Sequence, residues 1–102
     1  MMMSRSAALV AVTNLETLCQ DFGFPNERSR SEMLQIVHSL RSTGPEDGYF
    51  REKLFNIRMW AEIGFSIRKC KEFQGGASQL IVFALGDCST VRNLIQEHWP
   101  HH

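Results

Sequence analysis

The stretch from Phe55 to Ile67 alternates between apolar and other side chains. Every odd position is apolar, at Phe55, Ile57, Met59, Ala61, Ile63, Phe65 and Ile67. Among the even positions from Asn56 to Arg68, only Trp60 carries a large apolar side chain. A period of two is typical of a strand that buries one of its faces. We therefore predict a strand over residues 55–67.

A helix is the alternative for this stretch. Apolar or small residues also recur at helical spacing, at Phe50, Leu54, Ile57, Ala61 and Gly64. A helix would leave Met59, Ile63 and Phe65 scattered around its surface, and for this reason we favour the strand.

A second run, Leu80–Leu85, is apolar at every position and suits a strand that is covered on both faces. Gly75 and Gly76 lie between the two runs and offer a tight turn, so the pair predicts an antiparallel β-hairpin. After Gly86, Asp87 and Ser89 can cap a C-terminal helix. The apolar stripe of that helix is Val91, Leu94, Ile95 and Trp99, and Pro100 ends it.

The chain before the hairpin has a helical period. One stripe consists of Leu15, Leu18, Cys19 and Phe22, and a second of Met33, Ile36, Val37 and Leu40. Thr13 with Glu16, and Ser29 with Glu32, match the capping box that begins a helix. Gly23 separates the two stripes. We therefore predict a helical hairpin over residues 13–42, preceded by a loose tail over residues 1–12.

The length of 102 residues and an apolar fraction of 43% indicate a single globular domain. Turn-forming residues at positions 42–48 divide it. The predicted fold class is α+β, with a helical hairpin at 13–42 and a strand, strand and helix over 49–100.

The predicted strand is long for a domain of this size. Thirteen extended residues span about 43 Å, whereas a compact chain of this length has a diameter of roughly 33 Å. The strand must either bend at Gly64 or pair with a second copy. We expect a homodimer that continues the sheet, with a bent monomeric sheet as the alternative.

The charge balance and the cysteines indicate which partners and which compartment to expect. Eleven Lys and Arg balance eleven Asp and Glu, so no global field attracts nucleic acid or an anionic membrane. The three cysteines include no CxxC pair and follow no cleavable leader, which favours an intracellular protein, cytoplasmic or nuclear. No apolar run reaches the ~20 residues of a membrane span.

Residues 15–40 resemble the SAP motif, a module of helix, extended loop and helix that binds DNA. The matching residues are Leu15, Leu18-Cys19, Gly23-Phe24-Pro25, Ser29-Arg30-Ser31-Glu32-Met33-Leu34 and Val37. The resemblance implies that Arg28 and Arg30 contact phosphates near the start of the second helix. A plain helical hairpin with solvated arginines is the alternative.

The outward face of the predicted strand is a second candidate surface. It presents Arg58, Trp60 and Arg68 on one side. Cations that follow a phosphate backbone, together with an aromatic ring that stacks on a base, are suited to single-stranded nucleic acid. The alternative is that Trp60 packs under a helix or in a dimer interface.

Two further features, a cysteine and a group of histidines, are weaker candidates for a chemical site. Cys88 lies where the second strand is expected to turn into a helix, and the amide groups of a helix N-terminus lower the pKa of a thiol. Capping by Asp87 or Ser89 with Cys88 in the core is the simpler interpretation. His98, His101 and His102 gather at the C-terminus, but Pro100 breaks the helix that would align them, so we expect no metal site and no cofactor.

These features predict a small non-catalytic binding module. Nucleic acid is its expected ligand, held through Arg28, Arg30, Arg58, Trp60 and Arg68. The alternative is a protein-interaction subunit or adaptor that uses the edge strand and Trp60. An enzyme that uses Cys88 is a more distant alternative.

Overall fold

The computed structural model describes residues 3–100. The chain forms five helices: α1 (Arg5–Cys19), α2 (Glu27–Thr43), α3 (Gly48–Gly64), α4 (Ile67–Glu72) and α5 (Gly76–His98). No strand occurs anywhere between residues 3 and 100. The predicted α+β class is therefore wrong, because the described chain is all-helical.

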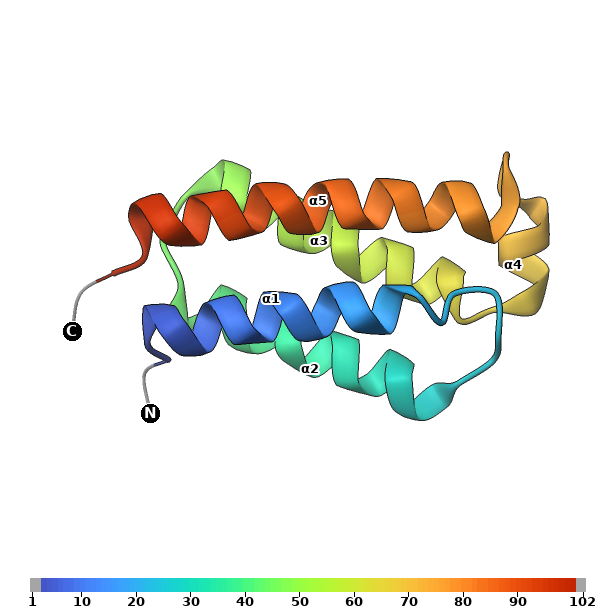
Figure 1. The fold of residues 1–102 in the computed structure, drawn as a ribbon, viewed down its shortest axis with the longest axis horizontal. Coiled ribbons are helices and arrows are strands. Elements are labelled where there is room, and N and C mark those ends of the chain that lie inside the picture. The colour runs from blue at the N-terminus through green and yellow to red at the C-terminus, as the bar shows by residue number, and fades with distance from the viewer. Residues whose placement is uncertain (1–2, 101–102) are drawn as a thin grey trace.

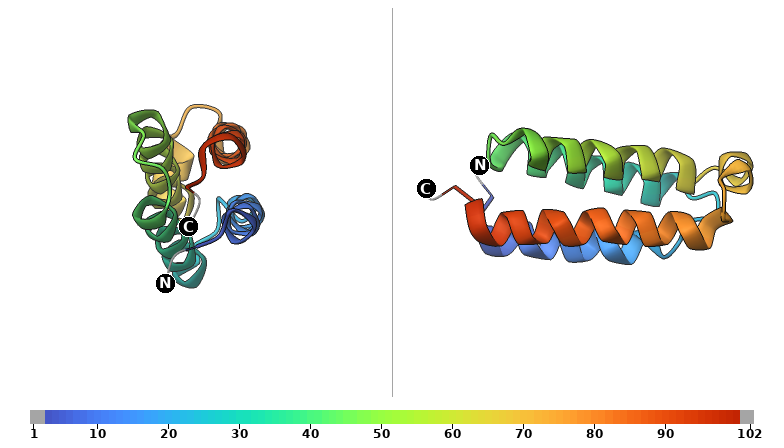
Figure 2. Two further views of the ribbon diagram at one scale, coloured as in Figure 1. Left: turned by 90° about the vertical axis from the view of Figure 1, so that its left-hand side faces the viewer. Right: turned by 90° about the horizontal axis from the view of Figure 1, so that it is seen from above.

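The four long helices form an antiparallel bundle of two layers. The α2–α3 pair makes one layer and the α1–α5 pair the other (Figure 2). The short helix α4 closes one end of the bundle, and the start of α1 and the end of α5 lie at the opposite end (Figure 1). Successive helices run in opposite directions, which is the up-and-down topology expected for short connections. None of the helices between residues 3 and 100 is both long and apolar enough to cross a bilayer.

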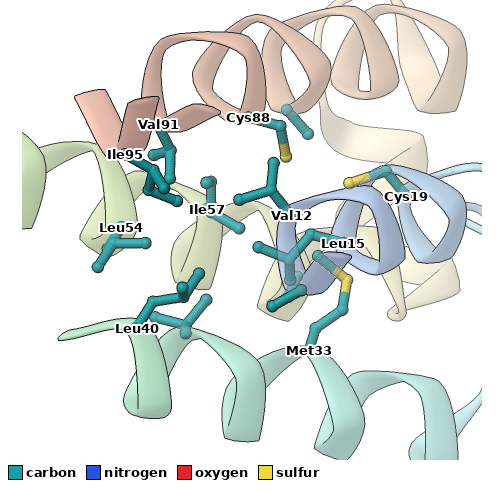
Figure 3. Packing of buried hydrophobic residues seen from close by; sticks show 14 of the residues in the cluster. Val12, Leu15, Cys19, Met33, Leu40, Leu54, Ile57, Cys88, Val91 and Ile95 are labelled. Carbon is teal, nitrogen blue, oxygen red and sulfur yellow. The ribbon is translucent and has the colours of Figure 1, made fainter. Parts of the chain in front are cut away.

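Each long helix contributes one apolar stripe to a shared core (Figure 3). The buried stripes are Ala8, Ala11, Val12, Leu15 and Cys19 in α1, Met33, Val37 and Leu40 in α2, Phe50, Leu54, Ile57 and Ala61 in α3, and Leu80, Ala84, Cys88, Val91 and Ile95 in α5. Their three- and four-residue spacings place them on one face of each helix. Burial of each larger side chain contributes about 1.5–3 kcal/mol, which favours the helical arrangement over an isolated two-stranded sheet.

The predicted strand over residues 55–67 is wrong. Residues 48–64 form α3, and Ile67 begins α4. The side chains that α3 buries are those of the helical alternative, with Phe50, Leu54 and Ile57 completely covered. Three other members of the alternating pattern lie outside the core, since Phe55 is 56%, Met59 39% and Ile67 46% exposed. Phe65 is buried, but it lies just past the end of α3. The alternation therefore reflects exposed apolar residues beside a helical stripe.

The second predicted strand, Leu80–Leu85, is also helical. It forms the first half of α5, which continues through Gly86 without a turn. Leu80 and Ala84 are buried, whereas Val82 is 60% and Phe83 46% exposed. A continuous apolar run thus supplies both faces of a helix. Without a sheet, the expected homodimer through a sheet edge loses its structural basis.

The helical hairpin begins earlier than its sequence signals suggest. α1 starts at Arg5 because the Ser4 hydroxyl accepts a hydrogen bond from the Ala7 amide at 3.0 Å, so the expected loose tail is wrong for residues 5–12. Positions 1 and 2 of that tail lie outside the described residues. Likewise, the cap of α2 is Asn26, whose side chain accepts from the Ser29 amide at 3.0 Å. Thr13 and Ser29 are therefore inside helices.

The turn after α1 packs tightly against the end of α3. The Gly23 amide donates a hydrogen bond of 2.7 Å to the Gly64 carbonyl. The Phe22 ring lies edge-on to Phe65, with ring centroids 5.2 Å apart. Gly23 has φ +101°, a left-handed conformation that glycine adopts at little cost. These contacts fasten the α1–α2 turn to the α4 end of the bundle.

Candidate binding groove

Arg30 is held inside the α2–α3 layer. Its guanidinium group donates to both carboxylate oxygens of Glu62 on α3, at 2.7–3.1 Å, and to Glu27 at 2.9 Å. The hydrogen bonds to Glu62 raise the pKa of Arg30 above its ordinary value, against the opposing effect of partial burial. Because two carboxylates already neutralise this cation, Arg30 is a poor ligand for phosphate.

Trp60 is half-buried between α3 and α5. Its indole N–H donates to Asp87 at 2.7 Å, and Lys53 lies 3.4 Å from the same carboxylate. The ring also packs against Phe73 and Phe83, with centroids 6.0 and 5.9 Å away. Trp60 therefore stabilises the contact between these helices, which was the alternative considered for it, and it does not stand free among arginines.

The remaining predicted site residues lie on separate parts of the surface. Arg28 is exposed at the start of α2. Arg68 is on α4, 3.7 Å from Glu72. Arg58 points toward α2, away from Trp60, because two residues on a helix differ by about 200° in direction. The structure thus does not bring the five residues together.

Arg58 instead lines a groove between α2 and α3. The groove has a volume of about 360 Å³. Its walls are Leu34, Val37, His38 and Arg41 from α2 and Arg51, Leu54, Phe55 and Arg58 from α3. The two helices are antiparallel and the Arg30–Glu62 bonds fix their register, so Arg41 lies opposite Arg51 and Leu34 opposite Arg58. We call these eight residues the α2–α3 groove.

The cations of the groove have few internal partners. Arg41 and Arg58 form no ion pair with any residue that the structure describes. Arg51 has one weak partner, Glu46, at 4.0 Å. Three arginines around one groove therefore favour an anionic ligand.

The floor of the groove is apolar. Leu54 and Val37 are buried beneath it, Leu34 is half-buried, and the Phe55 ring is 56% exposed. An aromatic side chain that is left in solvent beside partly covered aliphatic groups offers area for an apolar ligand group. The groove thus combines an apolar centre with a cationic rim.

Three of these groove residues were missed from the sequence: His38, Arg41 and Arg51. A strand at 55–67 places Arg58 on a sheet face, so no reason existed to relate it to residues of the first half. The helical period carries the signal, because Arg51, Phe55 and Arg58 follow one another at i, i+4 and i+7. Leu34, His38 and Arg41 repeat the same spacing on α2.

Cys88 does not lie at a helix N-terminus. It is completely buried in the middle of α5, and its sulfur faces that of Cys19 on α1 (Figure 3). The hydrogen bond with Cys19 and burial raise the pKa of the Cys88 thiol. The surroundings of Cys88 thus disfavour its thiolate form, whereas a position at the start of a helix would lower the pKa of the thiol.

No metal site is found in the part of the chain that the structure describes. No three side chains of His, Cys, Asp or Glu are grouped there to hold an ion. Of the C-terminal histidines, His101 and His102 lie outside the described residues, and His98 faces Glu97 at 3.5 Å.

Comparison of the chain with protein-family models, curated proteins and solved structures finds no match. The resemblance of residues 15–40 to the SAP motif therefore stays a prediction from sequence. In the structure, this stretch supplies parts of α1 and α2, joined by the turn that contains Gly23.

Proposed function

We propose that the protein is a non-catalytic binding module and that its α2–α3 groove binds an acidic segment of a partner protein. The observation that supports this most is the set of three arginines, Arg41, Arg51 and Arg58, around the exposed Phe55 ring. The first two lie at one end of the groove and the third at the other.

The chemistry of the groove suits carboxylate side chains. A guanidinium group binds a carboxylate with two parallel hydrogen bonds, which gives both strength and orientation. The rim is exposed, so each such pair adds only about 1 kcal/mol or less and weakens with salt. The apolar floor has to supply the remaining affinity by burying an aliphatic or aromatic side chain of the partner.

A protein segment suits this groove better than nucleic acid. A single strand requires a positive track that continues over several nucleotides. Here the positive rim is short, because Glu46 flanks it beside Arg51 and the Glu27–Arg30–Glu62 cluster lies beyond Arg58. Those carboxylates would repel a phosphate backbone that extends past the groove.

The test is a fluorescence-anisotropy titration with two labelled probes. One is a flexible acidic peptide of Glu, Leu and Phe, and the other is a single-stranded oligonucleotide of equal charge. We expect the peptide to bind more tightly and its affinity to fall as salt rises. Arg41→Glu with Arg58→Glu should weaken peptide binding by about tenfold or more, which corresponds to ~1.4 kcal/mol.

Arg28→Glu is the matched control, because it reverses one exposed arginine of α2 outside the groove. It should leave the affinity within about twofold, a change of ~0.4 kcal/mol. Tighter binding of the oligonucleotide would support the nucleic-acid hypothesis in place of ours. If neither probe binds, or if Arg28→Glu weakens the peptide as much as the groove variants, the proposal is wrong.

A further inference from the structure

The cations of the groove have a regular spacing along the helix axis. Arg51 and Arg58 are seven residues apart on α3, which is about 10.5 Å along a helix. Arg41 lies opposite Arg51, so positive charge is concentrated at both ends of this interval. Phe55, with His38 near it on α2, occupies the middle. The groove thus presents positive, apolar and positive regions in order.

We infer that the occupant of the α2–α3 groove is an amphipathic α-helix of the partner protein, with acidic residues at i and i+7 and large apolar residues at i+3 and i+4. Carboxylates at i and i+7 lie on one face of a helix, about 10.5 Å apart, which matches the distance along α3 between Arg51 and Arg58. The apolar residues at i+3 and i+4 lie on that face between them and meet Phe55 and Leu34. This inference rests on the proposed function.

An extended segment does not fit the same pattern. In a strand, side chains on one face repeat every ~6.8 Å, so two carboxylates on that face are either about 7 or about 14 Å apart. A polyproline helix places residues i and i+3 on one face, about 9.3 Å apart. That face carries no side chain between the two carboxylates, so no apolar group would reach Phe55. Only the α-helix offers both charges and the apolar anchor together.

The shape of the site agrees with a third helix. Two antiparallel helices side by side leave a lengthwise groove on their outer surface, and helices pack into such grooves with interaxial distances of about 8–10 Å. Here Leu34 and Phe55, from opposite walls, supply the apolar contact that a helix ridge needs. The outer face of the α2–α3 layer is free of α1 and α5, which lie behind it (Figure 2).

The experiment uses three labelled peptides that carry the same two Glu, one Leu and one Phe. The first is locked as a helix by a hydrocarbon staple on its outer face and carries Glu at i and i+7 with Leu and Phe at i+3 and i+4. The second is locked in the same way, but its second Glu is at i+5, which is turned by about 140° from the first. The third contains a central proline and remains unstapled, so it cannot form the helix.

We expect the first peptide to bind the 102-residue chain about tenfold more tightly than either of the others, a difference of ~1.4 kcal/mol. Arg58→Gln should remove most of the preference for the first peptide over the second, because these two differ only in the position of the second Glu, whereas Arg28→Glu should retain it. If all three peptides bind equally and binding still depends on Arg41 and Arg58, the helical partner is wrong and the proposed function stands. If none of the acidic peptides binds, both are wrong.

Discussion

At the scale of single residues, Gly64 shows how closely the turn after α1 approaches α3. A Cβ atom added at Gly64 would lie 2.3 Å from Phe22 Cδ1, well inside the contact distance, and the ring is buried. Gly64→Ala should therefore lower the free energy of unfolding by about 1–3 kcal/mol, the usual cost of overpacking. Gly48→Ala is the control, since nothing lies within 4 Å of its Cβ position. Urea denaturation of both variants measures the difference, and equal stabilities would contradict this packing.

The buried thiol of Cys88 predicts how stability depends on pH. Its pKa is raised in the folded protein, mainly by Cys19 and burial, so the unfolded chain loses this proton first as pH rises. The contribution of this thiol to the free energy of unfolding is then fully present below the ordinary thiol pKa of about 8.5. Above that pH the free energy of unfolding falls, by at most ~1.4 kcal/mol per pH unit for one thiol. Denaturation curves between pH 7 and pH 10 should show this decline. In Cys88→Ala the slope should be smaller, and an unchanged slope would contradict the assignment.

Individual residues were predictable from the sequence to different degrees. The sequence favours a core position for Cys88 and allows a packed position for Trp60 as an alternative, because buried thiols and tryptophans are more often structural than reactive. The ion pairs could not be predicted, since the Arg30–Glu62 bonds join residues whose relation depends on the register of two helices.

At the scale of elements, the main difference between prediction and structure lies in α3 and α5. Residues 55–67 carry a period of two and a period of 3.6 at the same time, and local pattern alone does not choose between them. Packing decides, because the helical stripe of Phe50, Leu54 and Ile57 has complementary stripes in three other helices. The exposed members, Phe55 and Met59, then give the groove and the outer face of α3 their apolar character.

A substitution at Gly86 tests whether α5 is continuous. It lies in the middle of this helix with no atom within 4 Å of its Cβ position. Gly86→Ala should therefore raise the free energy of unfolding by about 0.5–1 kcal/mol, because alanine favours the helix. Gly75→Ala should act in the opposite direction, since φ there is +93° and the added Cβ would lie 2.5 Å from that of Gln79. Thermal denaturation compares them, and a loss of stability in Gly86→Ala would indicate a turn at this position.

At the scale of the whole molecule, the two layers of the bundle differ in charge. Among Asp, Glu, Lys and Arg, α2 and α3 carry five residues each over 17 positions, whereas α1 carries two over 15 and α5 three over 23. The prediction of a single domain rests on length and composition. The asymmetry between layers could not be predicted in this way, because it depends on which helices lie side by side. It places most charged side chains of the four long helices on the α2–α3 layer.

The most direct test of this account is a ¹H–¹⁵N correlation NMR titration of the protein with the flexible acidic peptide. We predict that the perturbed amides form two stretches, at residues 34–41 of α2 and 51–58 of α3, which are the walls of the α2–α3 groove. The α1–α5 layer should change little. Perturbations centred on Arg28, Trp60 and Arg68, or on the α1–α5 layer, would contradict the account.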